Sequence, residues 1–281
     1  MRYFFDTITT KAYWQYSLLS KEGLKTIFAV FGLAFLLAQS LDFFNIVDAE
    51  QFGVEHFIAL VALSFTISFW EKRPVTSITV RSASKDYYVE VRVGDLLEAD
   101  GAIVISSNEY YESDVAGGKI SKDSLQGQFT LNYFAGNQTE LSKKISEELA
   151  TLGLQAPFPM GTVIQIPTHG KIFYFLSMAH LNESGNAYTS YDDLKASLKG
   201  LWHYVSTEGE LQELSLPVLG TGRGRLKMSR EEVVSIMVNS FKEASRDRKL
   251  TEHLTIYIRE ADARNFGVNL WELKDRIAKI L

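Results

Sequence analysis

The sequence predicts an α/β protein in which a mixed sheet lies between two layers of helices, preceded by a hairpin of two apolar helices. Two observations predict this fold class. After Pro74, short strand-like runs alternate with helix-like segments, as in a sheet covered by helices on both faces. Before Pro74, two long apolar segments follow one another with only a short loop between them.

Composition excludes several classes of protein. The net charge of −5 and a pI near 5.6 argue against a general nucleic-acid binder, which needs a basic face. The chain has no cysteine, so disulfides, thiolate zinc sites and a thiol nucleophile are excluded, which fits an intracellular main domain. The five histidines show no metal-ligand spacing. We therefore expect neither a metal nor a resident cofactor.

The first part of the chain is expected to contain an amphipathic or interfacial lead-in, Met1–Gly23, and two apolar segments. The first segment, Leu24–Val47, is interrupted only by Lys25 and Asp42 and is long enough to cross roughly 30 Å of hydrocarbon as a helix. The second reaches spanning length from Gly53 to Trp70. Both segments are therefore candidate membrane spans.

Charge placement predicts a hairpin in the inner membrane with both ends in the cytoplasm. Cations flank the two segments on their outer sides: Lys11, Lys21, Lys25, Lys72, Arg73 and Arg81. The charged residues of the connecting loop and its borders are all acidic, with no Lys or Arg among them: Asp42, Asp48, Glu50 and Glu55. The positive-inside rule then places the termini in the cytoplasm. A buried hairpin of a soluble protein stays open, and a cleaved signal peptide ending near Ala38–Ser40 is disfavoured by the long, partly acidic lead-in.

The composition changes near Glu71–Thr76, so we expect residues 1–73 to form the lead-in and hairpin and residues 74–281 to form one α/β domain. Strands are expected at Ser77–Arg81, Tyr87–Val93, Ala102–Ser107, Thr162–Ile166, Ile172–Ala179, Leu214–Leu219 and Leu254–Ile258. Helices are expected after the N-caps Thr139, Ser190 and Ser229, the last in a capping box with Glu232, and at Leu270–Leu281. The apolar stripe from Leu194 to Val205 is interpreted as core rather than as a cofactor site.

The segment Pro217–Leu226 has the layout of a phosphate-binding loop between a strand and a helix. It alternates glycines with polar residues: Gly220, Thr221, Gly222, Arg223, Gly224 and Arg225. Glycines let several backbone N–H groups point at one anion, and the N-terminus of the following helix adds partial positive charge. Arg223 and Arg225 supply guanidinium groups suited to a diphosphate. The alternative is a flexible turn whose arginines face water.

A second pattern suits nucleotide recognition. Gly94 and Asp95 precede the strand that ends at Asn108, so a carboxylate and a carboxamide lie at strand edges that can face one crevice. Asp95 can accept from an adenine amino group, and Asn108 can bridge ribose hydroxyls as donor and acceptor. Taken singly, the two are interpreted as a turn residue and a strand terminator.

Together these motifs resemble the macro domain, the ADP-ribose-binding module, over about residues 77–260. In that family the glycine–aspartate pair reads adenine, and it falls here on Gly94 and Asp95. The strand ending in asparagine falls on Ala102–Asn108, and the second phosphate loop on Pro217–Gly224. The resemblance implies a macro-domain-like three-layer α/β/α fold with ligand-binding residues Asp95, Leu96, Asn108, Asp114, Val115, Gly220, Thr221, Gly222, Arg223, Gly224 and Arg225.

Two departures from the family pattern concern catalysis. Ile105 stands where the family has the first asparagine of the strand-end motif, and Glu112–Gly118 replaces the polyglycine loop. Macro-domain hydrolases position water with that loop and those asparagines. The departures therefore favour binding over de-ADP-ribosylation, with Asp114 the one candidate base.

A narrower resemblance covers nearly the whole chain. Ser124–Phe129, Met160–Val163, Leu201–Trp202 and Pro217–Gly222 are similar to the macro domain of Thoeris anti-phage effectors, in which two membrane helices precede the macro module. The resemblance implies a TIR-domain partner that makes an ADP-ribose-derived signal, a histidine conjugate of ADP-ribose in type II systems.

The leading hypothesis is therefore a non-enzymatic defence effector that binds this signal and, as a homo-oligomer, disrupts the membrane lipid in abortive infection. The alternatives are a membrane-tethered ADP-ribosyl hydrolase and a tether with a vestigial pocket. Nucleic acid is not an expected partner.

Overall fold

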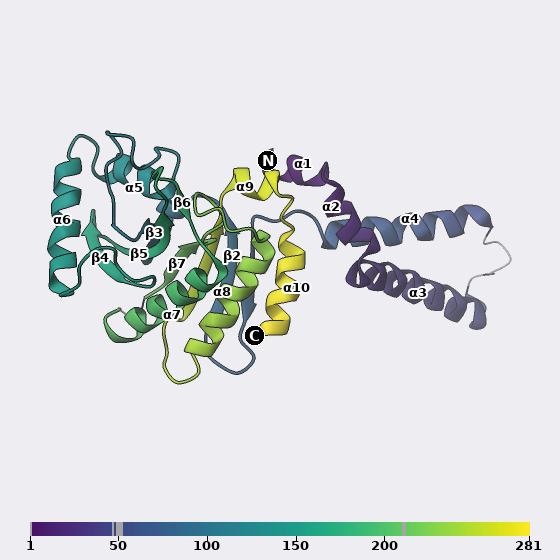
Figure 1. Cartoon of the computed structure of the whole chain (residues 1–281). Helices are drawn as coiled ribbons and strands as arrows, with labels where there is room; N and C mark the ends of the chain where they lie inside the picture. The colour runs from purple at the N-terminus through teal and green to yellow at the C-terminus, as the bar shows by residue number, and fades with distance from the viewer. Residues whose placement is uncertain (1, 47, 49–52, 210–211) are drawn as a thin grey trace. The chain divides into compact units, whose positions relative to one another are not determined.

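The computed structural model describes residues 2–46, 48, 53–209 and 212–281. The chain divides into two compact units. The first comprises Met1–Thr76 with Arg264–Glu272, and the second comprises Ser77–Ala263 with Leu273–Leu281. In Figure 1 the long helices of the first unit are purple to blue, and the sheet of the second unit runs from blue to yellow.

The first unit contains the two apolar helices that the sequence predicts. A lead-in of α1 (Arg2–Ile8), α2 (Lys11–Trp14) and the π-helix η1 (Gln15–Leu19) precedes α3 (Lys21–Phe43) and α4 (Val54–Glu71). Ser20 caps α3, because its side chain accepts from the N–H of Gly23. α3 and α4 pack against each other, with the rings of Phe31 and Phe57 5.9 Å apart.

Both long helices are long and apolar enough to cross a membrane by length and composition. Their apolar side chains largely face outward, unlike those of a core helix in a soluble protein: Phe28 is 69% and Leu36 64% exposed. The helix α3 ends at Phe43, whereas the sequence predicts that the first span continues to Val47. Val47 and the loop acid Glu50 lie outside the described residues.

The second unit is built on one mixed sheet of eight strands. The strands are β1 (Ser77–Arg81), β2 (Tyr88–Val93), β3 (Ala102–Asn108), β4 (Val163–Thr168), β5 (Lys171–Leu181), β6 (Ala187–Tyr188), β7 (Leu214–Pro217) and β8 (His253–Ile258). Their order is β1-β2-β8-β7-β3-β5-β4, with β6 paired to β5. The inner strands from β2 to β5 are parallel, and β1, β4 and β6 are antiparallel to their neighbours.

Helices cover both faces of this sheet, as Figure 1 shows. α5 (Leu125–Tyr133) and α6 (Gln138–Thr151) pack on one face, and α7 (Tyr191–Thr207) and α8 (Arg230–Ala244) cover the other. Alternation along β5 separates the faces, because Phe173 contacts Phe129 of α5 whereas Tyr174 contacts Tyr204 of α7. Two helices, α9 (Glu260–Asn265) and α10 (Leu270–Ile280), follow β8. The predicted three-layer α/β/α architecture is confirmed.

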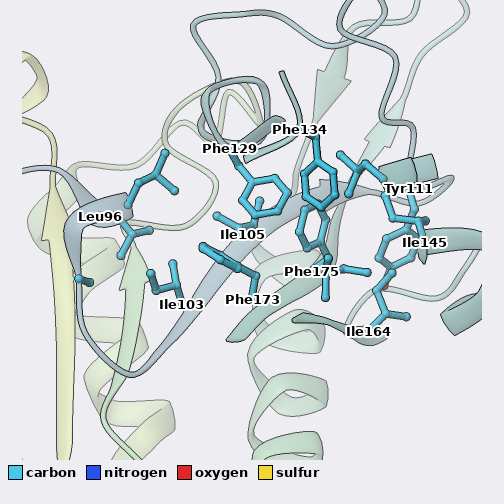
Figure 2. Packing of buried hydrophobic residues seen from close by; sticks show 14 of the residues in the cluster. Leu96, Ile103, Ile105, Tyr111, Phe129, Phe134, Ile145, Ile164, Phe173 and Phe175 are labelled. Carbon is cyan, nitrogen blue, oxygen red and sulfur yellow. The ribbon is translucent and has the colours of Figure 1, made fainter. Parts of the chain in front are cut away.

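An aromatic cluster fills the space between the sheet and α5, as Figure 2 shows. The ring of Phe129 lies 4.7 Å from that of Phe173 and 5.1 Å from that of Phe175. Ile103 and Ile105 of β3 join the same cluster and are fully buried. Position 105, where the macro-domain family has an asparagine, therefore contributes apolar packing, and each such buried side chain stabilises the fold by about 1.5–3 kcal/mol.

Two of the three predicted N-caps are confirmed. Ser190 and Ser229 each form a full capping box, with Asp193 and Glu232 respectively. The third prediction is wrong, because α6 starts after Asn137 and Thr139 lies inside the helix. The carboxamide of Asn137 instead donates to Glu140. Three elements, α5, α9 and β6, are not predicted from the sequence.

Candidate functional site

Asp95, the glycine loop and Asn108 lie at the carboxyl ends of three parallel strands of the sheet. Asp95 follows β2, the loop from Val218 to Met228 follows β7, and Asn108 ends β3. The strand order places β8 and β7 between β2 and β3, so three strand steps of about 4.8 Å put Asp95 and Asn108 about 14 Å apart. The glycine loop lies between them. Carboxyl ends of parallel strands are where open α/β sheets bind ligands.

Asp95 is exposed and starts a short 3₁₀ turn. Its Oδ1 atom accepts from the N–H of Leu97 at 2.9 Å, which leaves the outer lone pairs of the carboxylate facing solvent. Leu96 is only 4% exposed and belongs to the core cluster, so its side chain does not reach the surface. Among the described residues no acceptor is found for the N–H of Leu96, which can therefore bond a ligand beside Asp95.

The glycine loop offers a row of unused donors. Gly220 has φ +74° and Arg225 φ +54°, and the loop is closed by the N–H of Leu226 on the Gly220 carbonyl at 3.0 Å. Within the described ranges, the N–H groups from Thr221 to Gly224 have no acceptor. Consecutive exposed N–H groups in a glycine turn form an anion-binding nest. The hydroxyl of Thr221 donates within the loop, to the carbonyl of Val218.

Arg223 and Arg225 bond to two other loops. The Nη2 atom of Arg223 donates to Ser121 at 2.8 Å, and that of Arg225 donates to Asn186 at 3.1 Å. Gly224 lies close to the segment that follows Asn186, because a Cβ added at Gly224 would come 2.7 Å from the hydroxyl oxygen of Thr189. The arginines thus hold the glycine loop in place, and both remain exposed to an incoming anion.

The helix after the loop contributes less than the sequence suggested. α8 begins only at Arg230, and its N-terminus is occupied by its own capping box. Ser229 accepts from the N–H of Glu232, and the Glu232 carboxylate accepts from the Ser229 N–H at 2.9 Å. The N–H groups of Ser229 and Glu232 are therefore not available to an anion, and the contribution of the rest of the helix N-terminus stays a prediction. Among the described residues, the loop presents N–H groups without an acceptor from Thr221 to Gly224.

Asn108 organises the loop that follows β3. It is 5% exposed, and its Oδ1 atom accepts from the N–H groups of Tyr110 and Glu112 at 2.9 and 3.2 Å. This carboxamide oxygen is consequently committed to the backbone, which leaves only the NH₂ side for a ribose hydroxyl. The predicted role as both donor and acceptor is thereby narrowed to that of a donor.

Acidic side chains of the loop Glu112–Gly118 accept from three of the loop's own N–H groups. Glu112 Oε1 accepts from Ser113 and Asp114, and Asp114 Oδ1 accepts from Gly117 at 2.6 Å. Glu112 Oε2 pairs with Lys119 at 2.9 Å. Val115 is 2% exposed, so its side chain packs inward. Carboxylates therefore occupy donors that a polyglycine loop would leave for phosphate, and the glycine loop is the better seat for a diphosphate.

A polar cluster that the sequence analysis missed lies at the end of β5. His180 Nδ1 lies 2.6 Å from Glu109 Oε2, and His180 Nε2 lies 3.2 Å from Asp193 Oδ1. Burial lowers the pKa of His180, but the hydrogen bonds to both carboxylates outweigh burial and raise the pKa overall. Burial raises the pKa of Asp193, but the hydrogen bonds from Ser190 and His180 lower it by more. The net shift of the Asp193 pKa is therefore downward.

The Glu109–His180–Asp193 cluster ties β3, β5 and the start of α7 together beside Asn108. Glu109 and His180 are 71 residues apart in the chain, and His180 and Asp193 are 13 residues apart. Only the adjacency of Glu109 to the predicted Asn108 pointed to it.

A groove of about 920 Å³ lies between α7 and α8. Its lining includes Lys195, Trp202 and His203, and none of the predicted site residues. The strand-end site is an open edge with fixed donors, which matches a long anionic ligand better than this mixed groove does.

The family model described as "Thoeris protein ThsA, Macro domain" matches residues 89–259. This match spans the sheet from β2 to the end of β8 and includes both loops of the site. The chain belongs to the Thoeris ThsA macro-domain family. The predicted family is confirmed.

A curated relative supports the same family. Thoeris protein ThsA of Bacillus amyloliquefaciens (strain Y2) is 22% identical over 204 residues, which cover 66% of this chain and 67% of that protein.

Solved structures share the fold. The macrodomain of Oceanobacillus iheyensis with ADP superposes with a TM-score of 0.50 at 14% identity, covering 73% of this chain and 97% of that one. A glycine-to-valine mutant of the same macrodomain with ADPR gives 0.50 at 14% identity, covering 72% and 97%. The second unit thus has the macro-domain fold of the ThsA family.

Proposed function

We propose that this chain is a membrane-anchored receptor for an ADP-ribose-derived signal and acts as a Thoeris defence effector. The observation that carries the proposal is the row of N–H groups from Thr221 to Gly224, for which the described part of the chain offers no acceptor, set between Asp95 and Asn108 on a ThsA-family sheet. The diphosphate lies in the glycine loop, adenine at Asp95 and the distal ribose toward Asn108. The signal is of the histidine–ADP-ribose type and comes from a TIR-domain partner.

The hairpin is the output part of the proposal. α3 and α4 span the inner membrane, both chain ends and the macro domain face the cytoplasm, and several copies assemble to disrupt the bilayer. Gly32, Ala34, Ala38 and Ser40 are small residues at which helices can approach closely. The signal drives assembly if the assembled state binds it more tightly than the resting state does. Shifting the ratio of assembled to resting protein from 1:99 to 99:1 needs roughly 5.5 kcal/mol of differential binding free energy, shared among the copies.

Calorimetric titration of the full-length protein in detergent with ADP-ribose and its histidine conjugate tests the binding step. Asp95→Ala should weaken binding by on the order of 1–3 kcal/mol, because adenine's amino group loses its acceptor. Asp86→Ala is the matched control, since Asp86 is exposed in the β1–β2 turn at the other end of β2. Equal affinity of wild type and Asp95→Ala would place the adenine elsewhere.

Dye leakage from vesicles that carry the full-length protein tests the output step. The conjugate should raise leakage and increase the particle size in detergent, whereas the same vesicles without ligand stay sealed. A ligand that binds tightly but changes neither leakage nor size would reduce the protein to a tethered binding module.

A further inference from the structure

Arg259 occupies a position in the strand-end site that none of the predicted ligand residues covers. It follows β8 directly, and β8 lies between β2 and β7 in the sheet. The N–H of Gly94 donates to the carbonyl of Ile258 at 3.0 Å, so Arg259 comes about one strand spacing, ~4.8 Å, from the Gly94–Asp95 turn. On its other side, β8 pairs with β7, the strand that leads into the glycine loop. Arg259 therefore stands between the adenine contact and the diphosphate seat of the proposed site.

The side chain of Arg259 is held in one direction by two other parts of the chain. The carboxylate of Asp262 in α9 accepts from its Nε and Nη2 atoms at 3.1 and 3.3 Å. Its Nη1 atom donates to the carbonyl of Asp123 at 3.4 Å. The side chain is nevertheless 51% exposed, so its guanidinium group is both positioned and accessible from solvent. A guanidinium group that is fixed before binding loses little freedom when it binds an anion.

Arg223 of the glycine loop reaches the same short segment before α5. Its Nη2 atom donates to the hydroxyl of Ser121 at 2.8 Å, two residues before Asp123. Two residues of extended chain span at most about 7 Å, so two guanidinium groups, one after β8 and one after β7, converge on this segment. Guanidinium groups bind phosphate oxygens through paired N–H donors. The two arginines therefore suit two neighbouring phosphates, with Arg259 on the side of Asp95.

The bonds of Arg259 leave donors for a ligand. Each terminal nitrogen of a guanidinium group carries two N–H bonds. Within the described ranges, the bond to Asp123 uses one N–H on Nη1, and the bond to Asp262 uses one on Nη2. Each of these two atoms thus keeps a second N–H, and the planar group fixes the directions of both.

We propose that Arg259 binds the adenosine-side phosphate of the ligand and makes the site selective for phosphorylated adenosine. The order along the strand ends is then adenine at Asp95, the first phosphate at Arg259 and the second phosphate at the glycine loop and Arg223. The ligand class that fits this order is an adenosine carrying a phosphate on its 5′ carbon. This inference rests on the proposed function, because it assigns a further binding residue to the same ligand site.

The test compares adenosine, AMP and ADP-ribose on the full-length protein in detergent. Arg259→Met removes the charge and the donors while it keeps an unbranched side chain, and Arg259→Lys keeps the charge without the planar group. We expect Arg259→Met to weaken the binding of AMP and ADP-ribose by about 10-fold, from the loss of a charge-assisted contact. Adenosine affinity should stay within about twofold of wild type. Arg259→Lys should recover part of the loss for both phosphorylated ligands.

Arg248→Met is the matched control, because Arg248 is exposed beyond the C-terminal end of α8 and its loss changes the net charge equally. An equal loss for adenosine would show that Arg259 contacts the base or its ribose, and a loss for ADP-ribose alone would show that it contacts the second phosphate. Either result, or no loss for any ligand, overturns the inference. If Arg259→Met does not fold, Arg259→Lys decides, since its smaller loss should again be confined to AMP and ADP-ribose. A wild-type protein that binds no ADP-ribose would instead refute the proposed function itself.

Discussion

Arg223 donates from its Nη2 atom to the hydroxyl of Ser121 at 2.8 Å, which joins the glycine loop to the segment before α5. Ser121→Ala removes the acceptor and leaves the guanidinium exposed, so ADP-ribose affinity should stay within about threefold of wild type. Arg223→Ala removes a donor for the diphosphate and should weaken affinity by about 10-fold. Titration of both variants separates the two roles. Equal losses of affinity in the two variants would show that Arg223 acts only by holding the loop through Ser121, and not by binding the diphosphate.

Gly222 and Gly224 should respond differently to the same substitution. Gly222→Val adds atoms where the protein has none within 4 Å, so the free energy of unfolding should change by less than about 0.5 kcal/mol while ligand binding is blocked. Gly224→Val forces a Cβ within 2.7 Å of the Thr189 hydroxyl oxygen and should destabilise the fold by about 1–3 kcal/mol. Denaturant unfolding and titration measure the two effects. A Gly222→Val variant with wild-type affinity would move the diphosphate elsewhere.

The hairpin topology can be tested with introduced cysteines, because the chain has none of its own. Asp48→Cys lies between the two spans and Thr76→Cys lies after the second. If α3 and α4 both cross the membrane, an impermeant thiol reagent should label Asp48→Cys from outside and Thr76→Cys only after the membrane is opened. Labelling of both from one side contradicts the two-span hairpin.

No appreciable release of ADP-ribose from a modified protein is expected. Ile105 is buried in the aromatic cluster and has no polar atom to hold the water that the family's asparagine would position, which leaves Asp114 as the one candidate base, with its Oδ1 atom accepting from the N–H of Gly117. A discontinuous assay for free ADP-ribose checks this. Release that is lost in Asp114→Ala would establish the hydrolase alternative.

The His180 cluster predicts a pH dependence of stability. The folded-state pKa of His180 is raised above its ordinary 6.5, so its contribution is complete below pH 6.5 and is lost as pH rises through the folded value. His180→Gln should therefore lower Tm most at pH 6 and progressively less toward pH 9. Asp193 has a lowered pKa and stays ionised across this window. Thermal scans at several pH values measure the difference.

His203→Gln, which replaces an exposed histidine on α7, serves as the control for losing an imidazole outside the cluster. A constant difference between His180→Gln and wild type from pH 6 to pH 9 would mean that the imidazole acts without its charge.

Local signals in the sequence predicted most of the fold. Serine located the starts of α7 and α8, for α8 together with the acid three residues later, because capping depends on neighbours in the chain. Runs of β-branched and apolar residues located the strands to within a few residues. α5 was missed because Leu125–Tyr133 has no apolar stripe of helical period; what fixes it is the packing of Phe129 on the sheet.

The sequence identified candidate site residues but not the bonds between them. Glycine spacing identified the loop from Gly220 to Arg225, since backbone freedom is a local property. The partners of Asn108 and Arg223, and the cluster around His180, depend on residues brought together by the strand order. No spacing rule connects Glu109 with His180, so only the folded chain reveals that pair.

The strand order also sets the sequence of events on the ribosome. β2 lies between β1 and β8, and β8 is the last strand of the chain, so the sheet closes only after more than 150 residues have followed β2 out of the exit tunnel. α3 and α4 emerge long before that point. If α3 and α4 are the proposed membrane spans, a newly made chain presents its hairpin to the bilayer while the proposed receptor domain is still unfinished. The proposed function then requires that a hairpin released by interrupted translation stays harmless without the completed domain.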